Sequence, residues 1–295
     1  MVLILSFVML FLLSCTDWQR DHVHDPNGVN YIGEGNNSSS SSKSSSSSDV
    51  ADSSSSSNVT NNSSSGVGVL SGTFTDERDD QTYNWIKIGD QIWMAENLNY
   101  GGPINAPNTI CKCVGEVGTT GWLVDSGGRC SIYGRLYDWA AALDINPACN
   151  SNLLSHASCN VTETKHKGIC PEGWHVPSDE EWNALALAVG GTWHPLRIAG
   201  ATTSLKATIG WNTDSSAPGT NSSGFSALPG GYGYYVGDTD AVFELVGDAG
   251  YWWCATEFSA DRANYTNMFY SNSDMEYYGG NGKTALSSVR CVQND

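Results

Sequence analysis

Residues 170–185, Cys-Pro-Glu-Gly-Trp-His-Val-Pro-Ser-Asp-Glu-Glu-Trp-Asn-Ala-Leu, contain the clearest helix start in the chain. Ser178 takes the N-cap position and Glu181 the third helical position, which is the spacing of a capping box. The two acidic residues between them place negative charge where the helix dipole favours it. Gly190-Gly191 is expected to end the helix after about three turns. One apolar stripe should pack on strands that precede and follow the helix: Trp182, Leu185, Ala186 and Val189.

Residues 1–14 are almost wholly apolar, too short to span a bilayer as a helix, and typical of a signal-peptide core. They run into Leu12-Leu13-Ser14-Cys15, which resembles the bacterial lipobox, although no Lys or Arg precedes the apolar run. In a lipobox the cysteine becomes the lipid-bearing N-terminus, and more than one acyl chain gives stable anchoring. We expect an exported lipoprotein, lipidated at Cys15 and held at the outer membrane or cell surface. A plainly cleaved signal and a residual anchor are the alternatives.

Residues 15–68 are polar and contain long runs of serine. Such a segment buries too little apolar area to offset its ordering entropy, so we expect a disordered tether. A flexible chain of about 50 residues has an end-to-end distance of roughly 40 Å. The sequence therefore predicts three parts: a signal peptide at 1–14, a lipidated linker at 15–68 and a folded domain at 69–295.

The formal net charge of −17 argues against nucleic acid and anionic membrane surfaces as partners. Nine cysteines less Cys15 leave an even number, which predicts disulfides in an exported chain. Cys111-Lys-Cys113 is too closely spaced for a zinc knuckle, so metal ligation is disfavoured. The cysteines expected in disulfides are Cys111, Cys113, Cys130, Cys149, Cys159, Cys170, Cys254 and Cys291.

The folded part mixes strand patterns with helical ones. A first helix is expected at 133–143, with Leu136, Trp139 and Leu143 on one face. We expect the α+β class: a single disulfide-rich domain with two main helices and short antiparallel strands. The expected strands are 73–75, 82–88, 91–94, 204–207, 224–232, 250–257, a hairpin of 266–270 with 275–278, and a closing strand at 285–293.

Several long motifs occur in order between residues 73 and 292: Phe74–Asp76, Trp85–Tyr100, Tyr133–Trp139, Cys170–Ser178, Gly224–Tyr232, Gly250–Trp253 with Ala255–Glu257, and Ser288–Val292. Together these motifs resemble the Fibrobacter succinogenes major paralogous domain. A lipobox followed by a serine-rich tether is also typical of that family. The family is distantly similar to C-type lectins and formylglycine-generating enzymes, which implies a C-type-lectin-like architecture.

The lectin resemblance implies a particular disulfide. In C-type lectins a cysteine just before a similar helix bonds to a cysteine in the last strand, which implies a Cys170–Cys291 bond here. Closing so long a loop contributes about 5 kcal/mol in the chain-entropy model. Cys254 is the competing partner of Cys291 if the two strands that carry them lie side by side. With Cys170–Cys291 formed, Cys254 is expected to pair with a loop cysteine.

The lectin calcium signature is missing, so calcium-dependent sugar binding is not carried over. Ala106-Pro-Asn108 lacks the acidic first ligand and Trp211-Asn212-Thr213 lacks the aspartate. We expect no cofactor and no bound metal, and a solvated loop is the favoured interpretation of the later acidic residues. The weak candidates for a cation site there are Asp238, Asp240, Glu244 and Asp248.

No catalytic arrangement stands out in the sequence. Formylglycine-generating enzymes use a reactive cysteine pair, whereas Cys254 and Cys291 are explained here by disulfides. His175 and His194 have no third, orienting group at a recognisable spacing. We expect a non-catalytic protein and keep an enzyme of unknown chemistry as the least favoured alternative.

The aromatic residues carry the functional prediction. Tryptophans within the motifs are expected in the core, whereas several tyrosines fall in Gly- and Asn-rich turns and hairpins. Exposed tyrosine rings are suited to stacking on sugars or to protein contacts. This predicts a binding module for polysaccharide or a surface protein, with a structural subunit of a surface assembly as the alternative. The candidate ligand-binding residues are Tyr232, Tyr234, Tyr235, Tyr265, Tyr277 and Tyr278.

Overall fold

The computed structural model describes residues 70–101, 111–112, 129–159, 166–236, 240–276 and 280–294. The chain divides into two units, Met1–Ser54 and Ser55–Asp295, and every described residue belongs to the second. The signal segment, Cys15 and the serine-rich linker therefore lie outside the described residues. In the part of the chain that is described, no helix is both long enough and apolar enough to cross a membrane.

A five-stranded sheet joins the two ends of the domain. Its order is β1-β2-β3-β16-β6, and every neighbouring pair is antiparallel. The first three strands form a meander, whereas β16 inserts the end of the chain between β3 and β6. The bounds are β1 (Ser71–Asp76), β2 (Gln81–Ile88), β3 (Gln91–Met94), β16 (Val292–Gln293) and β6 (Trp174–His175).

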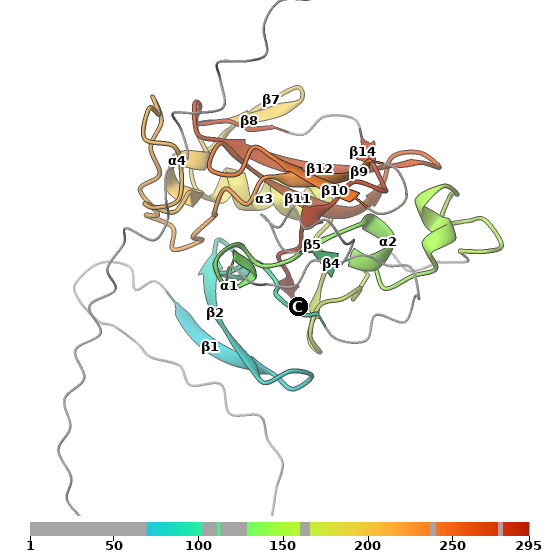
Figure 1. Ribbon diagram of the computed structural model, residues 1–295. Coiled ribbons are helices and arrows are strands. Elements are labelled where there is room, and N and C mark those ends of the chain that lie inside the picture. The colour runs from blue at the N-terminus through green and yellow to red at the C-terminus, as the bar shows by residue number, and fades with distance from the viewer. Residues whose placement is uncertain are drawn as a thin grey trace, which may run out of the picture. The chain divides into compact units, whose positions relative to one another are not determined.

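A larger sheet holds most of the C-terminal half, and a short hairpin lies beside it (Figure 1). The order of the large sheet is β4-β5-β15-β11-β12-β13-β8-β7, with β14 also paired to β12. Its bounds are β4 (Cys111–Lys112), β5 (Leu136–Tyr137), β15 (Ser287–Ser288), β11 (Ala249–Glu257), β12 (Arg262–Phe269), β13 (Met275–Glu276), β8 (Arg197–Ala199), β7 (Thr192–His194) and β14 (Asn281–Gly282). The hairpin consists of β9 (Tyr232–Val236) and β10 (Asp240–Glu244).

The helix expected after Ser178 is confirmed as α3 (Asp179–Ala188). Both bonds of the capping box form: Glu181 N donates to Ser178 Oγ at 3.2 Å, and Ser178 N donates to Glu181 Oε2 at 2.8 Å. Figure 1 shows α3 alongside β11 and β12, and residues of α3 contact both strands. Trp182, Leu185 and Ala186 are buried, so the expected apolar stripe does face the sheet.

The expected α+β class with two main helices is wrong. Of the described residues, 35% lie in strands and 14% in helices, and only α3 is long. The segment 133–143 is not one helix, because Gly134 adopts a φ of 74° and the chain then forms β5. A Cβ atom at Gly134 would lie 2.7 Å from Asn97 Cβ, so the break is set by close packing. The other helices are α1 (Arg129–Tyr133), α2 (Trp139–Ala142), α4 (Thr202–Leu205) and a 3₁₀ helix (Pro147–Asn150).

Three expected strands differ from the structure. Residues 202–205 form α4, and Lys206 beyond it sends its ammonium group to the carbonyl oxygens of Ala217, Phe269 and Asn272 at 2.6, 3.0 and 2.9 Å. Residues 224–231 form isolated bridges, and a strand begins only at Tyr232. The closing strand is split into β15 and β16. The hairpin of β12 and β13 is confirmed.

Two adjacent tryptophans on β11 pack in two different core clusters. Trp252 packs with Trp93, Trp182 and Phe225 beneath α3. Trp253 lies in a second cluster that includes Trp139. Successive side chains of a strand point to opposite faces, so this one strand supplies the centre of both clusters. Large aromatic residues therefore lie on both faces of β11.

Two disulfides are formed within the described residues. Cys170 bonds to Cys291 across 121 positions, and Cys149 bonds to Cys159 across 10. Cys130 is also disulfide-bonded, and its partner lies outside the described side chains. Cys254 is a free, buried thiol, so the expectation that it pairs with a loop cysteine is wrong. The Cys170–Cys291 bond ties the segment before β6 to the residue that precedes β16.

Candidate functional site

Four tyrosine side chains form a continuous row across β9, β11 and β12. In spatial order the row is Tyr234, Tyr232, Tyr251 and Tyr265, with ring centroids separated by 6.0, 5.1 and 5.8 Å. All four side chains are half-buried. We call this set the tyrosine row. It joins segments distant in sequence because β9 begins beside β11, through a bridge between Gly231 and Gly250.

A carboxylate holds one end of the tyrosine row. Tyr232 Oη donates to Glu244 Oε2 at 2.7 Å, and Tyr234 Oη donates to Glu244 Oε1 at 2.7 Å. Burial and the bond to Glu244 raise the pKa of Tyr232 to about 12, and the two phenol donors lower the pKa of Glu244. The two rings are thereby fixed on one face of the hairpin.

The structure joins some of the predicted tyrosines and separates others. Tyr235 lies on the opposite face of β9, where it packs beside Leu136 and Leu286. Tyr265 is in the row but also packs against the larger core cluster. Tyr277 and Tyr278 lie outside the described residues.

Sequence reasoning missed Tyr251, which lies in the middle of the row. Its position between Gly250 and Trp252 suggested only a core strand. A signal was present: Tyr251 shares a strand face with Trp253. A row of this kind needs three strands to come together, which no local pattern reveals.

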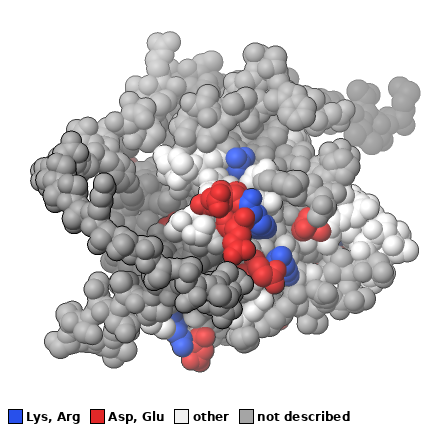
Figure 2. All heavy atoms as spheres, turned by 90° about the horizontal axis from the view of Figure 1, so that it is seen from below, with Lys and Arg blue, Asp and Glu red and all other residues white. Residues whose placement is uncertain are grey.

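The acidic candidates do not form a metal centre in the described part of the chain. Glu244 is occupied by the two phenols, and Asp248 accepts a bond from Asn212 Nδ2 at 3.3 Å. Asp238 and the side chain of Asp240 lie outside the described residues. Among the described residues, no group of three His, Cys, Asp or Glu side chains could hold a metal ion. On the face drawn in Figure 2, a central group of acidic side chains has basic side chains beside it, and further acidic side chains lie apart from this group.

The residues considered for catalysis lie in different environments. His175 is buried, with Nε2 2.8 Å from Glu181 Oε1 and Nδ1 2.6 Å from Asn294 Oδ1. His194 is exposed on β7. Burial raises the pKa of the Cys254 thiol well above its ordinary value, which disfavours the reactive thiolate.

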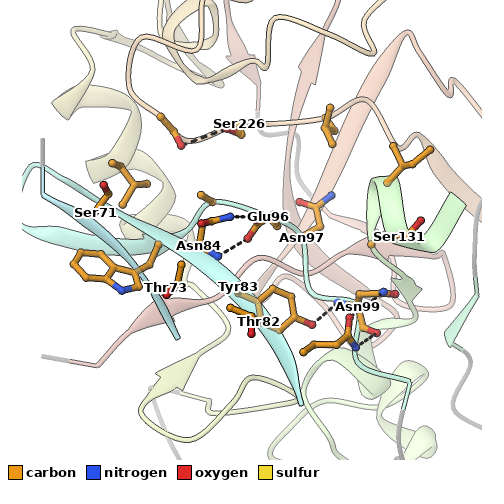
Figure 3. A pocket seen from close by; sticks show the side chains of 18 of the residues that line it. Ser71, Thr73, Thr82, Tyr83, Asn84, Glu96, Asn97, Asn99, Ser131 and Ser226 are labelled. Atoms are coloured by element: carbon orange, nitrogen blue, oxygen red, sulfur yellow. Dashed lines mark hydrogen bonds between the residues drawn. The ribbon is translucent and has the colours of Figure 1, made fainter. Parts of the chain in front are cut away.

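A second feature, not predicted from the sequence, is an open pocket of about 660 Å³. It lies between the β1–β2 hairpin, the segment that follows β3, helix α1 and the loop before β9 (Figure 3). Its volume is within the range of about 300–1,000 Å³ that is usual for ligand sites. The hydrogen-bonding side chains that line it are Ser71, Thr73, Gln81, Thr82, Tyr83, Asn84, Glu96, Asn97, Asn99, Ser131 and Ser226.

Glu96 is the only acidic or basic residue among the described residues that line the pocket. Its carboxylate is held by Asn84 from β2: Asn84 N donates to Oε2 at 2.7 Å, and Asn84 Nδ2 donates to Oε1. Figure 3 shows these two side chains meeting at the centre of the lining. Each carboxylate oxygen keeps a further lone pair, so the group can still accept bonds from a ligand.

Behind the pocket, Asn97 is bound to a fully buried arginine. Asn97 Oδ1 accepts from Arg290 Nε at 3.0 Å, from Arg290 Nη2 at 2.8 Å and from Trp252 Nε1 at 2.8 Å. Burial lowers the pKa of Arg290 to about 9, and the negative charge of Glu96 acts in the opposite direction. The guanidinium therefore remains charged at neutral pH and interacts with the pocket carboxylate.

Asn99 forms one end of the pocket. Its backbone N donates to Tyr83 Oη at 3.1 Å, and its Nδ2 donates to Gln81 Oε1 at 3.1 Å. Its Oδ1 is buried without a hydrogen-bond partner among the described residues. A buried acceptor without a partner is costly.

The fold and these sites define a mostly β, disulfide-bonded domain that carries a row of tyrosines and a polar pocket. Residues 86–293 match the family described as the Fibrobacter succinogenes major domain. The chain belongs to that family, which confirms the resemblance in the sequence motifs. Comparisons with curated proteins and with solved structures found no match.

Proposed function

We propose that the chain is a lipid-anchored surface protein whose C-terminal domain is a non-catalytic module that binds polysaccharide. The observation that carries the proposal is the tyrosine row: four half-buried rings on three strands, two of them fixed by Glu244. Tyrosine rings held in place offer apolar surface and hydroxyl groups at little entropic cost. Sugar rings present the same combination of C–H faces and hydroxyl groups.

The arrangement of carboxyl groups supports binding rather than hydrolysis. Most glycosidases use two carboxyl groups on either side of the scissile bond. At the tyrosine row, Glu244 accepts a bond from a phenol on each of its two oxygens, and a second carboxylate, Glu276, acts on Tyr251 only through its charge. The pocket has Glu96 as the only carboxylate of its described lining.

Binding of the full chain to insoluble cellulose, xylan and mannan tests the proposal, with and without a chelator. We expect retention that is independent of the chelator and is weakened at least about ten-fold, or about 1.4 kcal/mol, by Tyr232→Ala with Tyr234→Ala. Tyr234→Phe keeps the ring and should retain most binding. Phe258→Ala removes an exposed aromatic ring outside the row and serves as the matched control.

Two results would contradict the proposal. If the double alanine variant is retained as well as the unaltered protein, the tyrosine row is not the polysaccharide-binding site. Failure to bind any polysaccharide, together with co-purification of the chain with other surface proteins, would favour a structural subunit of an assembly.

Lipid anchoring is tested separately from binding. Mass spectrometry of the mature protein should find an acylated N-terminus at Cys15, and Cys15→Ser should abolish the modification. An unmodified N-terminus elsewhere would instead indicate a plainly cleaved signal.

A further inference from the structure

The pocket beside β1 and β2 is separate from the tyrosine row. No residue of the row lines it, and its walls come from β1, β2, α1 and two connecting segments. Several lining side chains point toward one space in Figure 3, although they come from segments distant in sequence. The pocket therefore has to be explained on its own chemistry.

That chemistry is neutral hydrogen bonding. The lining offers hydroxyl and amide groups from Ser71, Thr73, Asn84, Asn99 and Ser226, and these groups can both donate and accept. Trp85, also in the lining, is buried, and Gly72 packs closely against it: a Cβ at Gly72 would lie 2.7 Å from the indole. Polar groups that both donate and accept match a ligand rich in hydroxyl groups.

The negative charge of the pocket is balanced by a buried positive charge behind its lining. Glu96 is negative, and the buried guanidinium of Arg290 interacts with it through the protein interior. The formal charges of this pair sum to zero. An anionic ligand would meet the Glu96 carboxylate directly, whereas a cationic ligand would be repelled by the buried charge of Arg290 behind that carboxylate.

The acceptors are fixed before a ligand arrives. Asn84 orients Glu96, and the buried Asn97–Arg290–Trp252 bonds hold the adjoining backbone. Asn99 Oδ1 is a buried lining acceptor without a partner among the described residues. A preorganised set of acceptors loses little entropy on binding and favours a ligand with several hydroxyl donors.

We infer that this pocket binds a sugar unit of a neutral saccharide, with Glu96 and Asn84 as its central hydrogen-bonding pair. The inference rests on the proposed function for the class of ligand, and it adds a second site with different residues. Vicinal hydroxyl groups of the sugar donate to the free lone pairs of Glu96.

Titration calorimetry of the full chain with cellohexaose, xylohexaose and mannohexaose tests the inference. Hexamers of galacturonate and of glucosamine serve as anionic and cationic probes. We expect at least one neutral hexaose to bind and Glu96→Gln to weaken it at least about ten-fold. Glu180→Gln, an exposed site on α3, is the matched control, and unfolding curves check that each variant is folded.

Side-chain amide signals in NMR locate the site on the unaltered protein. Binding of the neutral hexaose should shift the amide resonances of Asn84 and Asn99. One combination of results would overturn this inference and leave the proposed function standing: binding is lost in Tyr234→Ala, binding is unchanged in Glu96→Gln, and the amide resonance of Asn84 does not shift. Binding of the glucosamine hexamer alone would overturn the neutral class. Failure of every hexamer and every insoluble polysaccharide to bind would overturn both.

Discussion

Asn97 Oδ1 accepts hydrogen bonds from both Nε and Nη2 of Arg290, which joins residues 193 positions apart in the buried interior. Arg290 is fully buried and has no ion-pair partner among the described residues; its Nη1 donates to the carbonyl oxygen of Phe225. The guanidinium also stacks 4.3 Å from the Phe225 ring centroid. One amide oxygen thus satisfies two donors of a buried cation.

Asn97→Ala is expected to destabilise the domain by about 3–5 kcal/mol, because it leaves donors of Arg290 and the Trp252 N–H unpaired in the interior. Urea unfolding measures the change. Asn212→Ala, at an exposed turn, should shift stability by no more than about 0.5 kcal/mol. If the two substitutions lower the free energy of unfolding equally, the buried hydrogen bonds of Asn97 do not stabilise the domain.

Lys283→Met should also cost about 3–5 kcal/mol. The buried ammonium lies 2.6 Å from Glu257 Oε1 and also donates to the carbonyl oxygens of Cys149, Asn152 and Ala260. Lys167→Met is the control, since its ion pair with Glu172 is exposed and contributes less than about 1 kcal/mol. A small effect at Lys283 in thermal unfolding would refute the prediction.

The two described disulfides should differ in their contribution to stability. In the chain-entropy model the Cys170–Cys291 bond, across 121 positions, contributes about 5 kcal/mol. The Cys149–Cys159 bond, across 10 positions, contributes about 3 kcal/mol. Paired serine substitutions, compared by guanidinium unfolding, test the order. A larger loss from the shorter bond would contradict it.

Glu244 should titrate at a higher pH when a phenol donor is removed. Its pKa is lowered by bonds from Tyr232 and Tyr234, so Tyr234→Phe should move it back toward the ordinary value. A depressed folded-state pKa means that its contribution to stability is present above the unfolded pKa and is lost as the pH falls through the folded pKa. NMR titration of the Glu244 carboxyl carbon measures the shift, and Tyr270→Phe, outside the row, should leave it unchanged.

Cys254 should resist alkylation until the domain unfolds. The thiol is buried and its pKa is raised by burial. With no reductant present, iodoacetamide should therefore leave Cys254 unmodified in the folded protein and modify it once denaturant is added. Peptide mass spectrometry gives the result. A peptide that stays unmodified even in denaturant would mean that Cys254 is in a disulfide after all.

The local parts of the fold could be predicted because their determinants are neighbours in sequence. Ser178 and Glu181 are three positions apart, and their capping box forms as expected. The β2–β3 hairpin likewise follows from its strand patterns and Gly89. The helix expected at 133–143 failed because contacts with Asn97, distant in sequence, favour a break at Gly134.

The candidate sites were only partly accessible to the same reasoning. Tyr232, Tyr234 and Tyr265 were identified by composition, whereas Tyr251 was missed and Tyr235 turned out to face a small core cluster. The pocket was missed altogether, because Asn84 and Glu96 look like ordinary surface residues until β2 and the segment after β3 lie side by side.

By itself, the sequence determined the capped helix, several of the strands and the family to which the chain belongs, since each depends on short-range spacing or on intact motifs. The tertiary structure decided which cysteine stays free, which tyrosines share a face and where the pocket lies. The physical reason is that these features depend on contacts between distant segments. Their formation is governed by packing around Trp252, Trp253 and Arg290, which no local pattern encodes.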